Sequence, residues 1–154
     1  MRLLHTIVDV LVVGAAAGGL AIGLALYRAD LAEQTAIEST RAAVSTMNAQ
    51  IGMRTLLSET TLNEHGFPTS IDPSWFETGE PRNALARAEA PWVELASEAE
   101  SNRKHPIVPT FRSGRGAMFW YNPSLGVVRA RVPEQTTDES TRTLYTLVNG
   151  SGWE

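Results

Sequence analysis

An apolar run near the start of the chain constrains its fold more than any other feature. Residues 7–27 contain no charged side chain except Asp9, and Ala, Gly, Leu, Val and Ile make up most of the run. About 20 apolar residues in a helix span the hydrocarbon core of a bilayer. The run ends at Tyr27 beside Arg28, an aromatic and charged edge that is typical of a membrane interface. We therefore predict a short N-terminal segment at residues 1–6 and a transmembrane helix at residues 7–27.

The main alternative to a retained anchor is a cleaved signal peptide, whose apolar region is shorter and is followed by a small-residue cleavage site. The charges that flank the run predict its orientation. The amine of Met1 and Arg2 are positive before the run, whereas Arg28 is offset by Asp30 and Glu33 after it. Positive residues favour the cytoplasmic side. We therefore expect a single-pass protein of the inner (cytoplasmic) membrane, in contact with lipid, with a cytoplasmic N-terminus and an extracytoplasmic C-terminal domain.

Residues 28–63 have the composition of a long helix. All eight prolines of the chain lie between Pro68 and Pro133, so none interrupts this segment. Apolar residues recur there at helical spacing, which predicts an amphipathic helical stalk at residues 28–63. The apolar stripe must pack either on the C-terminal domain of the same chain or on another helix as a coiled coil, and we expect the first arrangement. The stripe consists of Leu31, Ile37, Val44, Met47, Ile51 and Leu57.

Residues 64–154 are expected to form a small extracytoplasmic domain with a β-hairpin near residues 117–132. Ala117–Tyr121 is rich in strong β-formers, and Gly126–Val132 alternates apolar and polar residues in its second half. Asn122–Gly126 joins them, with Asn, Pro and Gly where a turn requires them. An antiparallel pair is therefore predicted.

Four further segments complete the predicted domain. Trp92–Ala96 alternates bulky and small residues and predicts a strand, and Thr143–Asn149 predicts a final strand. Ala84–Ala90 could form a short helical turn, and the polar segment Pro133–Arg142 is expected to be a loop. The predicted fold class is α+β, with a long N-terminal helix, transmembrane and then amphipathic, packed on a small antiparallel β-sheet.

No pattern of residues predicts catalysis or metal binding. The histidines His5, His65 and His105 lack the spacing of metal ligands, and the chain contains no cysteine. Ser113–Gly116 is glycine-rich, but it lacks the longer spacing ending in Lys-Ser/Thr that a phosphate-binding loop requires. We therefore expect a non-enzymatic protein without catalytic residues, metal or cofactor.

The charged and aromatic residues of the hairpin leave two interpretations open. The net charge of −4 gives no reason to expect nucleic-acid binding, which needs a clustered basic face. Trp120 and Tyr121 point to opposite faces of one strand, and we expect the stalk to cover one and a loop the other. Four arginines could form a basic patch, although a solvated strand face is the preferred interpretation. These arginines are Arg112, Arg115, Arg129 and Arg131.

Asp9 is the informative residue of the apolar run. A charged side chain costs about 2.5–3.5 kcal/mol at the centre of a membrane and less near its edge. Asp9 therefore either reaches interfacial water or is protonated, or it pairs with a cation on a neighbouring chain. Gly14 and Gly18 have the spacing that lets membrane helices approach closely, although Gly and Ala are also frequent in membrane helices in general.

The segment His5–Val13 resembles the N-terminal signature of type IV pilins and type II secretion pseudopilins. In that signature, Thr-Leu-Ile-Glu-Leu-Leu-Val-Val precedes a Gly/Ala-rich apolar run, so Thr6 matches the family Thr and Asp9 matches its fifth-position Glu. In the family, this acid pairs with the methylated N-terminal amine of the neighbouring subunit during assembly. Leu4 stands where the family leader ends in Gly, so the resemblance implies an unprocessed relative that keeps Met1.

This resemblance implies a pilin-like plan and a role in assembly. The chain would be a non-enzymatic subunit or accessory protein of a type II secretion or type IV pilus-like assembly. Its partners would be other pilin-like subunits or membrane proteins of the secretion machine. Together with the glycine spacing, the resemblance points to Asp9, Thr6, Gly14 and Gly18 as assembly residues. The alternative is a membrane-tethered extracytoplasmic binding or sensor domain that uses the helix only as an anchor.

Overall fold

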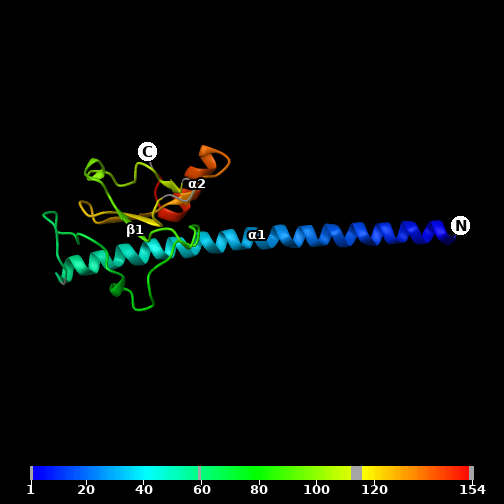
Figure 1. The fold of residues 1–154 in the computed structure, drawn as a ribbon, viewed down its shortest axis with the longest axis horizontal. Coiled ribbons are helices and arrows are strands. Elements are labelled where there is room, and N and C mark those ends of the chain that lie inside the picture. The colour runs from blue at the N-terminus through cyan, green and yellow to red at the C-terminus, as the bar shows by residue number, and fades with distance from the viewer. Residues whose placement is uncertain (1, 59, 112–115, 153–154) are drawn as a thin grey trace. The chain divides into compact units, whose positions relative to one another are not determined.

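A long helix, two small sheets and a C-terminal helix give the chain an α+β fold (Figure 1). The computed structural model describes residues 2–58, 60–111 and 116–152, with side chains described from residue 23 onward. The chain divides into two units, residues 1–35 and residues 36–154. The predicted α+β class, with a long N-terminal helix packed on small sheets, is confirmed.

Helix α1 spans Arg2–Leu57 and contributes to both units. In the first unit, the described apolar side chains Leu24, Leu26 and Tyr27 are exposed. Within the part of the chain whose side chains are described, from residue 23 onward, no helix is long and apolar enough to cross a membrane. Most of the predicted transmembrane helix lies in residues 7–22, outside the part of the chain whose side chains are described.

In the second unit, α1 buries one face against the sheet. The predicted residues Val44, Met47 and Ile51 are 5% exposed or less, and they recur at the three- and four-residue spacing of a single helix face. Ile37 is partly buried at the edge of the same core. The expected packing of this stripe on the domain of the same chain is therefore confirmed for residues 37–51. It is wrong for Leu57, which lies at the end of α1 and is 55% exposed.

The predicted stalk is too long at its C-terminal end. α1 ends at Leu57, not at residue 63, because Ser58 adopts a left-handed backbone conformation with φ of 51°. Asn63 then organises a tight turn in which its Oδ1 accepts hydrogen bonds from the backbone N–H groups of His65 and Phe67. The helix therefore stops well before the proline-containing region.

The main sheet has three strands in the order β1–β3–β4. β3 (Phe119–Asn122) and β4 (Val127–Ala130) are antiparallel, with Phe119 opposite Ala130, so the predicted hairpin is confirmed. β1 (Val93–Leu95) lies parallel to β3. The prediction of a purely antiparallel sheet is therefore wrong, because strand direction depends on the path of the long connection between β1 and β3.

Several short elements surround this sheet. β2 (Thr110–Phe111) and β5 (Val132–Pro133) form a second, two-stranded parallel sheet. Two 3-10 helices span Pro73–Trp75 and Glu98–Glu100. The predicted helical turn at Ala84–Ala90 is instead a pair of hydrogen-bonded turns, with Ala86 N–H donating to Asn83 O and Ala90 N–H to Arg87 O.

Helix α2 spans Asp138–Asn149, so the predicted strand at Thr143–Asn149 is wrong, and the predicted loop ends at Thr137. Thr137 caps the helix by accepting from Ser140 N–H, and two acidic residues follow in the first turn, where the helix dipole favours them. Gly150 ends the helix with φ of 70°. The buried face contains Thr141, Leu144, Tyr145 and Val148.

The core lies on the sheet face that receives both helices. Phe119, Tyr121, Val128 and Ala130 project from this face and are fully buried. They join the buried residues of α1 and α2 in one apolar cluster. The other face is covered by the segment at residues 98–108. Carbonyl groups of this segment accept hydrogen bonds from Asn122 of β3, from Arg129 of β4 and from Arg131, which follows β4. Burial of the strands on both faces explains why β3 has no exposed residue.

Two asparagine side chains close the outer edge of β4. The backbone groups of Val128 and Ala130 that point away from β3 need other partners, because β4 is an edge strand. Asn48 of α1 accepts from Val128 N–H at 3.0 Å and donates to Val128 O at 3.4 Å. Asn149 of α2 accepts from Ala130 N–H at 2.8 Å and donates to Ala130 O at 3.0 Å. Each amide therefore takes the place of a peptide group on a neighbouring strand.

Candidate functional site

The four residues predicted for assembly lie on α1. Thr6, Asp9, Gly14 and Gly18 all have helical backbone conformation. Their side-chain surroundings lie outside the described part of the chain. Their assembly role therefore stays a prediction.

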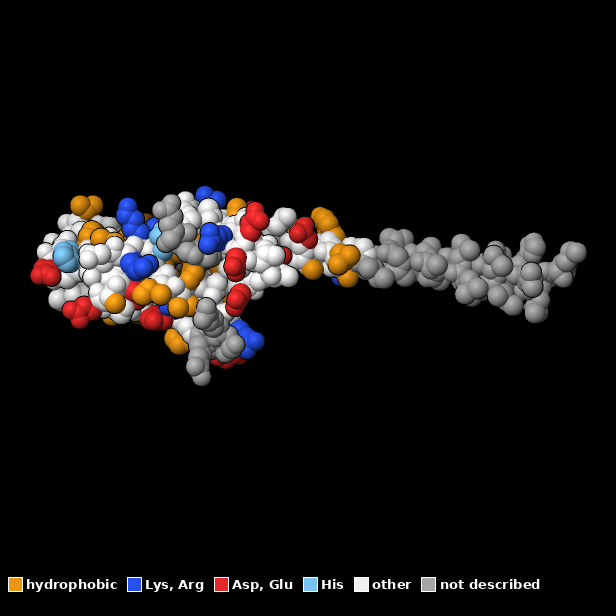
Figure 2. All heavy atoms as spheres, turned by 90° about the horizontal axis from the view of Figure 1, so that it is seen from above, with side chains coloured by type: hydrophobic (Ala, Val, Ile, Leu, Met, Phe, Trp, Pro, Cys, Tyr) orange, Lys and Arg blue, Asp and Glu red, His pale blue; other side chains and the backbone are white. Residues whose placement is uncertain are grey.

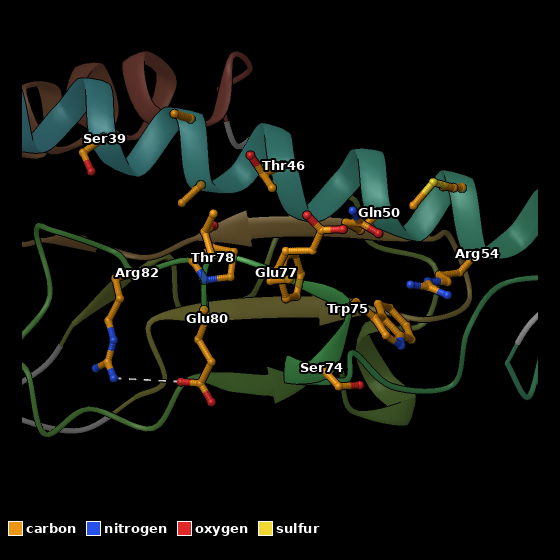
Figure 3. A pocket seen from close by; sticks show the side chains of 16 residues that line it. Ser39, Thr46, Gln50, Arg54, Ser74, Trp75, Glu77, Thr78, Glu80 and Arg82 are labelled. Carbon is orange, nitrogen blue, oxygen red and sulfur yellow. Dashed lines mark ion pairs between the residues drawn. The ribbon is translucent and has the colours of Figure 1, made fainter.

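In the second unit, a groove lies between α1 and the segment at residues 74–82 (Figure 3). Its volume is about 670 Å³. Ala43 and Phe76 form a buried apolar floor. In Figure 3, Thr46, Gln50 and Arg54 lie on the helix side of the groove, opposite the side chains of the loop.

The groove offers both apolar and polar contacts. The Arg54 guanidinium lies 5.7 Å from the ring centroid of Trp75, a cation–π contact that spans the groove end. Gln50 Oε1 is buried and has no hydrogen-bond partner among the described residues. A buried acceptor without a donor costs free energy.

The rim of the groove is held by short-range hydrogen bonds. Asp72 caps the 3-10 helix at Pro73–Trp75 by accepting from Ser74 N–H at 2.8 Å. Hydrogen bonds from the Ser74 side chain and backbone hold the pKa of the Asp72 carboxyl below its ordinary value. The ion pair of Arg82 with Glu80, at 3.9 Å, is exposed and contributes little stability.

Asn83 connects this loop to α1 and to the sheet. Its side chain is 2% exposed and donates to Met118 O at 3.0 Å and to Arg131 O at 2.8 Å. Thr40 Oγ1 of α1 lies 3.2 Å from Asn83 Oδ1 and accepts from Ala84 N–H at 3.0 Å. This network fixes the loop that forms one wall of the groove.

The structure describes two of the four arginines that could form a basic patch, Arg129 and Arg131. Arg112 and Arg115 lie outside the described residues. Arg131 is buried and pairs with Glu94, with Nη1 of the arginine 2.7 Å from Oε2 of the glutamate. Arg129 is partly buried and donates from Nε to Lys104 O at 3.2 Å. The preferred interpretation of a solvated strand face is therefore wrong for Arg131, because its neighbours in space are distant in sequence.

The aromatic pair on β3 is fully buried on both faces, as predicted. Tyr121 lies in the core with α1 and donates from its hydroxyl to Pro68 O at 2.6 Å. Trp120 lies on the opposite face and is 0% exposed. Neither ring is available as an interface anchor.

Glu100 is a buried carboxylate that the sequence patterns did not identify. It is 8% exposed, and its carboxylate accepts from Ile107 N–H at 2.9 Å and from the backbone and hydroxyl of Ser97. Burial by itself would raise the pKa of Glu100, but these hydrogen bonds outweigh it and lower the pKa. The role of Glu100 is to hold the segment over the sheet.

Neither His65 nor His105, the two histidines whose side chains the structure describes, belongs to a group of metal-binding side chains. His65 is exposed beside Glu64 at 3.6 Å, and His105 contacts Tyr145. Among the described residues, no three His, Asp or Glu side chains come together to hold a metal ion. His5 lies where side chains are not described.

Comparisons with protein-family models, curated proteins and solved structures found no match to this chain.

Proposed function

We propose that the protein is a non-enzymatic, pilin-like subunit or accessory protein of a type II secretion or type IV pilus-like assembly. In this proposal it is anchored in the inner membrane, with its C-terminal domain outside the cytoplasm. The observation that carries the proposal is the composition of α1. This one helix contains the apolar run with Asp9 and also the segment that buries Val44, Met47 and Ile51 on the domain.

A helix that is part of the domain core can act as more than an anchor. A simple tether needs no burial of its own residues in the domain that it carries. Here Met47 and Ile51 are 0% and 1% exposed, and Asn48 satisfies the edge of β4. Contacts made by the apolar run with a neighbouring helix would then act on an element of the folded domain itself. This coupling is what a subunit of a helix-based assembly requires.

Asp9 supplies the specificity in this proposal. An acid in the apolar run pairs with a cation of a neighbouring chain, because an isolated charge is unfavourable in lipid. Gly14 and Gly18 would allow the two helices to approach closely. Thr6 lies three residues from Asp9, on the same side of a helix, and can hydrogen-bond across the contact.

The test is to replace Asp9 by Ala, by Asn and by Glu in the full chain, and to measure its crosslinking to neighbouring chains in native membranes. We expect Asp9→Ala and Asp9→Asn to reduce the crosslinked complex about tenfold, and Asp9→Glu to retain it, because only Glu keeps the charge. Asp30→Ala is the matched control, since Asp30 lies on the same helix beyond the apolar run. Equal complex formation by wild type and Asp9→Ala, at equal membrane levels, would refute the pairing role.

The groove favours a second candidate function, a membrane-tethered binding or sensor domain. Its volume of about 670 Å³ and its combined apolar and polar lining are the observations that favour it among the described residues. Replacing residues 7–27 by an unrelated transmembrane helix separates the two candidates. A tethered binding domain retains its cellular role after the exchange, whereas a pilin-like subunit loses it.

A further inference from the structure

Three basic side chains line a small pocket on the domain, and a fourth, Arg129, contacts the backbone of the segment that carries them. Arg103, Lys104 and His105 line a hollow of about 260 Å³ together with Gly152. Arg129 of β4 reaches the same segment, because its Nε donates to Lys104 O at 3.2 Å. Figure 2 shows Lys, Arg and His side chains close together on one face of the molecule. We call Arg103, Lys104, His105, Arg129 and Gly152 the basic pocket.

The cations of the basic pocket lack a counter-ion among the described residues. No described carboxylate lies within 4.0 Å of Arg103, Lys104 or Arg129, whereas Arg131, two residues along the chain from Arg129, pairs with Glu94 at 2.7 Å. Arg129 donates only to backbone carbonyls in the described part of the chain, those of Lys104 and Val128. Burial lowers the pKa of Arg129. A partly buried charge without an opposite charge is unfavourable, so an anion that entered the pocket would be stabilised there.

His105 adds a hydrogen-bond donor to this pocket. Its Nδ1 lies 3.1 Å from the hydroxyl of Tyr145, a fully buried residue of α2. Burial raises the pKa of Tyr145, so the hydroxyl keeps its proton and can donate to Nδ1. Burial, and then the positive charges of Arg129 and Lys104, lower the pKa of His105, so the ring is neutral near pH 7. A neutral ring that accepts at Nδ1 carries its proton on Nε2 and donates from there.

We propose that the basic pocket binds a phosphate-type oxoanion. Three neighbouring cations, of which Arg129 is held by backbone hydrogen bonds, favour a multiply charged anion. A phosphate group carries about −1.5 to −2 charges at pH 7. The Arg129 guanidinium offers its outer N–H groups, Lys104 an ammonium and His105 a ring N–H, which are donors that phosphate oxygens accept. The same chemistry is present in inorganic phosphate and in the monoester headgroup of phosphatidic acid. The site is independent of the pilin-like role.

The experiment follows the ring of His105 by NMR in the full chain, held in non-ionic detergent micelles. Inorganic phosphate is titrated against sodium chloride at equal ionic strength, and the pKa of His105 is measured in each. We expect phosphate to raise the pKa of His105, because a bound anion stabilises the charged ring and offsets the repulsion from Arg129 and Lys104. We expect Arg129→Gln and Lys104→Gln each to weaken phosphate binding about tenfold.

The controls decide whether binding belongs to this pocket. Arg41→Gln removes one exposed positive charge from α1 and should leave phosphate affinity within about twofold of wild type. Lys104 is exposed, so Lys104→Gln tests the pocket even where Arg129→Gln unfolds the domain. Equal loss of affinity in Arg41→Gln and Lys104→Gln would overturn the proposal, because it would indicate a general charge effect.

Short-chain phosphatidic acid added to the micelles distinguishes the source of the anion. An effect of inorganic phosphate on His105 supports a site for the free ion. An effect of phosphatidic acid alone, absent with a phosphatidylcholine of the same chain length, supports a site for the lipid headgroup. An unchanged pKa of His105 with both probes would overturn the proposal.

Discussion

Replacing Asn149 by Ala is the sharpest test of how this domain is held together. The substitution removes the only described partners of the Ala130 N–H and C=O, which bond to the amide at 2.8 and 3.0 Å. Ala130 is fully buried, so water cannot easily replace the amide. A buried backbone group that loses its partner costs about 1–3 kcal/mol, and two such groups are affected here. The two groups together cost about 2–6 kcal/mol, and Ala favours helix by about 0.5 kcal/mol, so we expect a net loss of about 1.5–5.5 kcal/mol.

Urea unfolding of the full chain in micelles, followed by tryptophan fluorescence, measures this loss, because Trp120 is fully buried in the domain. Asn149→Asp refines the test: it keeps the acceptor for Ala130 N–H but places a carboxylate oxygen against Ala130 O and Tyr145 O at the end of α2, so we expect a loss at least as large as that of Asn149→Ala. Asn102→Ala is the matched control, since Asn102 is exposed, and its effect should stay within about 0.5 kcal/mol. If Asn149→Ala and Asn102→Ala unfold at the same urea concentration, the amide does not stabilise the edge of β4.

Substitutions at two glycines should change the stability of the domain in opposite directions, and Glu100 should make its stability depend on pH. Gly126→Ala should destabilise by at least about 2 kcal/mol, because φ is 63° and an added Cβ would lie 2.3 Å from the ring of Phe67. Gly52→Ala should stabilise by about 0.5–1 kcal/mol, since it lies inside α1 with no atom within 4 Å of the added Cβ; the urea midpoints of the two variants check both signs. Because the pKa of Glu100 is lowered on folding, its contribution is present above pH 4.5 and is lost as the pH falls through the folded value. Urea unfolding between pH 7 and pH 3 should therefore show a steeper loss in wild type than in Glu100→Gln, and equal slopes would contradict this.

Local sequence was sufficient for the hairpin and for the packed part of α1. The turn between β3 and β4 contains Gly126, whose positive φ most other residues would find unfavourable. Alternation placed Val128 and Ala130 on one face, and both are fully buried. These features depend on neighbours within a few residues, so pattern and turn chemistry predict them.

Local sequence also contained signals for α2 that the β-branched residues concealed. Thr143–Asn149 is rich in Thr, Leu, Val and Tyr, several of which favour strands when they are considered alone. The cap at Thr137 and the glycine at Gly150 mark the helix ends, and the buried residues recur at helical spacing. Capping residues outweighed strand propensity because the amphipathic face packs on β4 and β5.

The sequence by itself determined the apolar run, the stripe of α1 and the hairpin, because each depends on spacing along a single element. Tertiary structure decided which polar groups meet. Arg131 pairs with Glu94 across 37 residues, Arg129 reaches Lys104 across 25, and Asn48 closes the edge of β4 across 80. It also made β1 parallel to β3. Such contacts depend on how the connections return over the sheet. Two arginines that alternate with alanine along the chain therefore have different partners: Arg131 pairs with the carboxylate of Glu94, and Arg129 donates to backbone carbonyl groups.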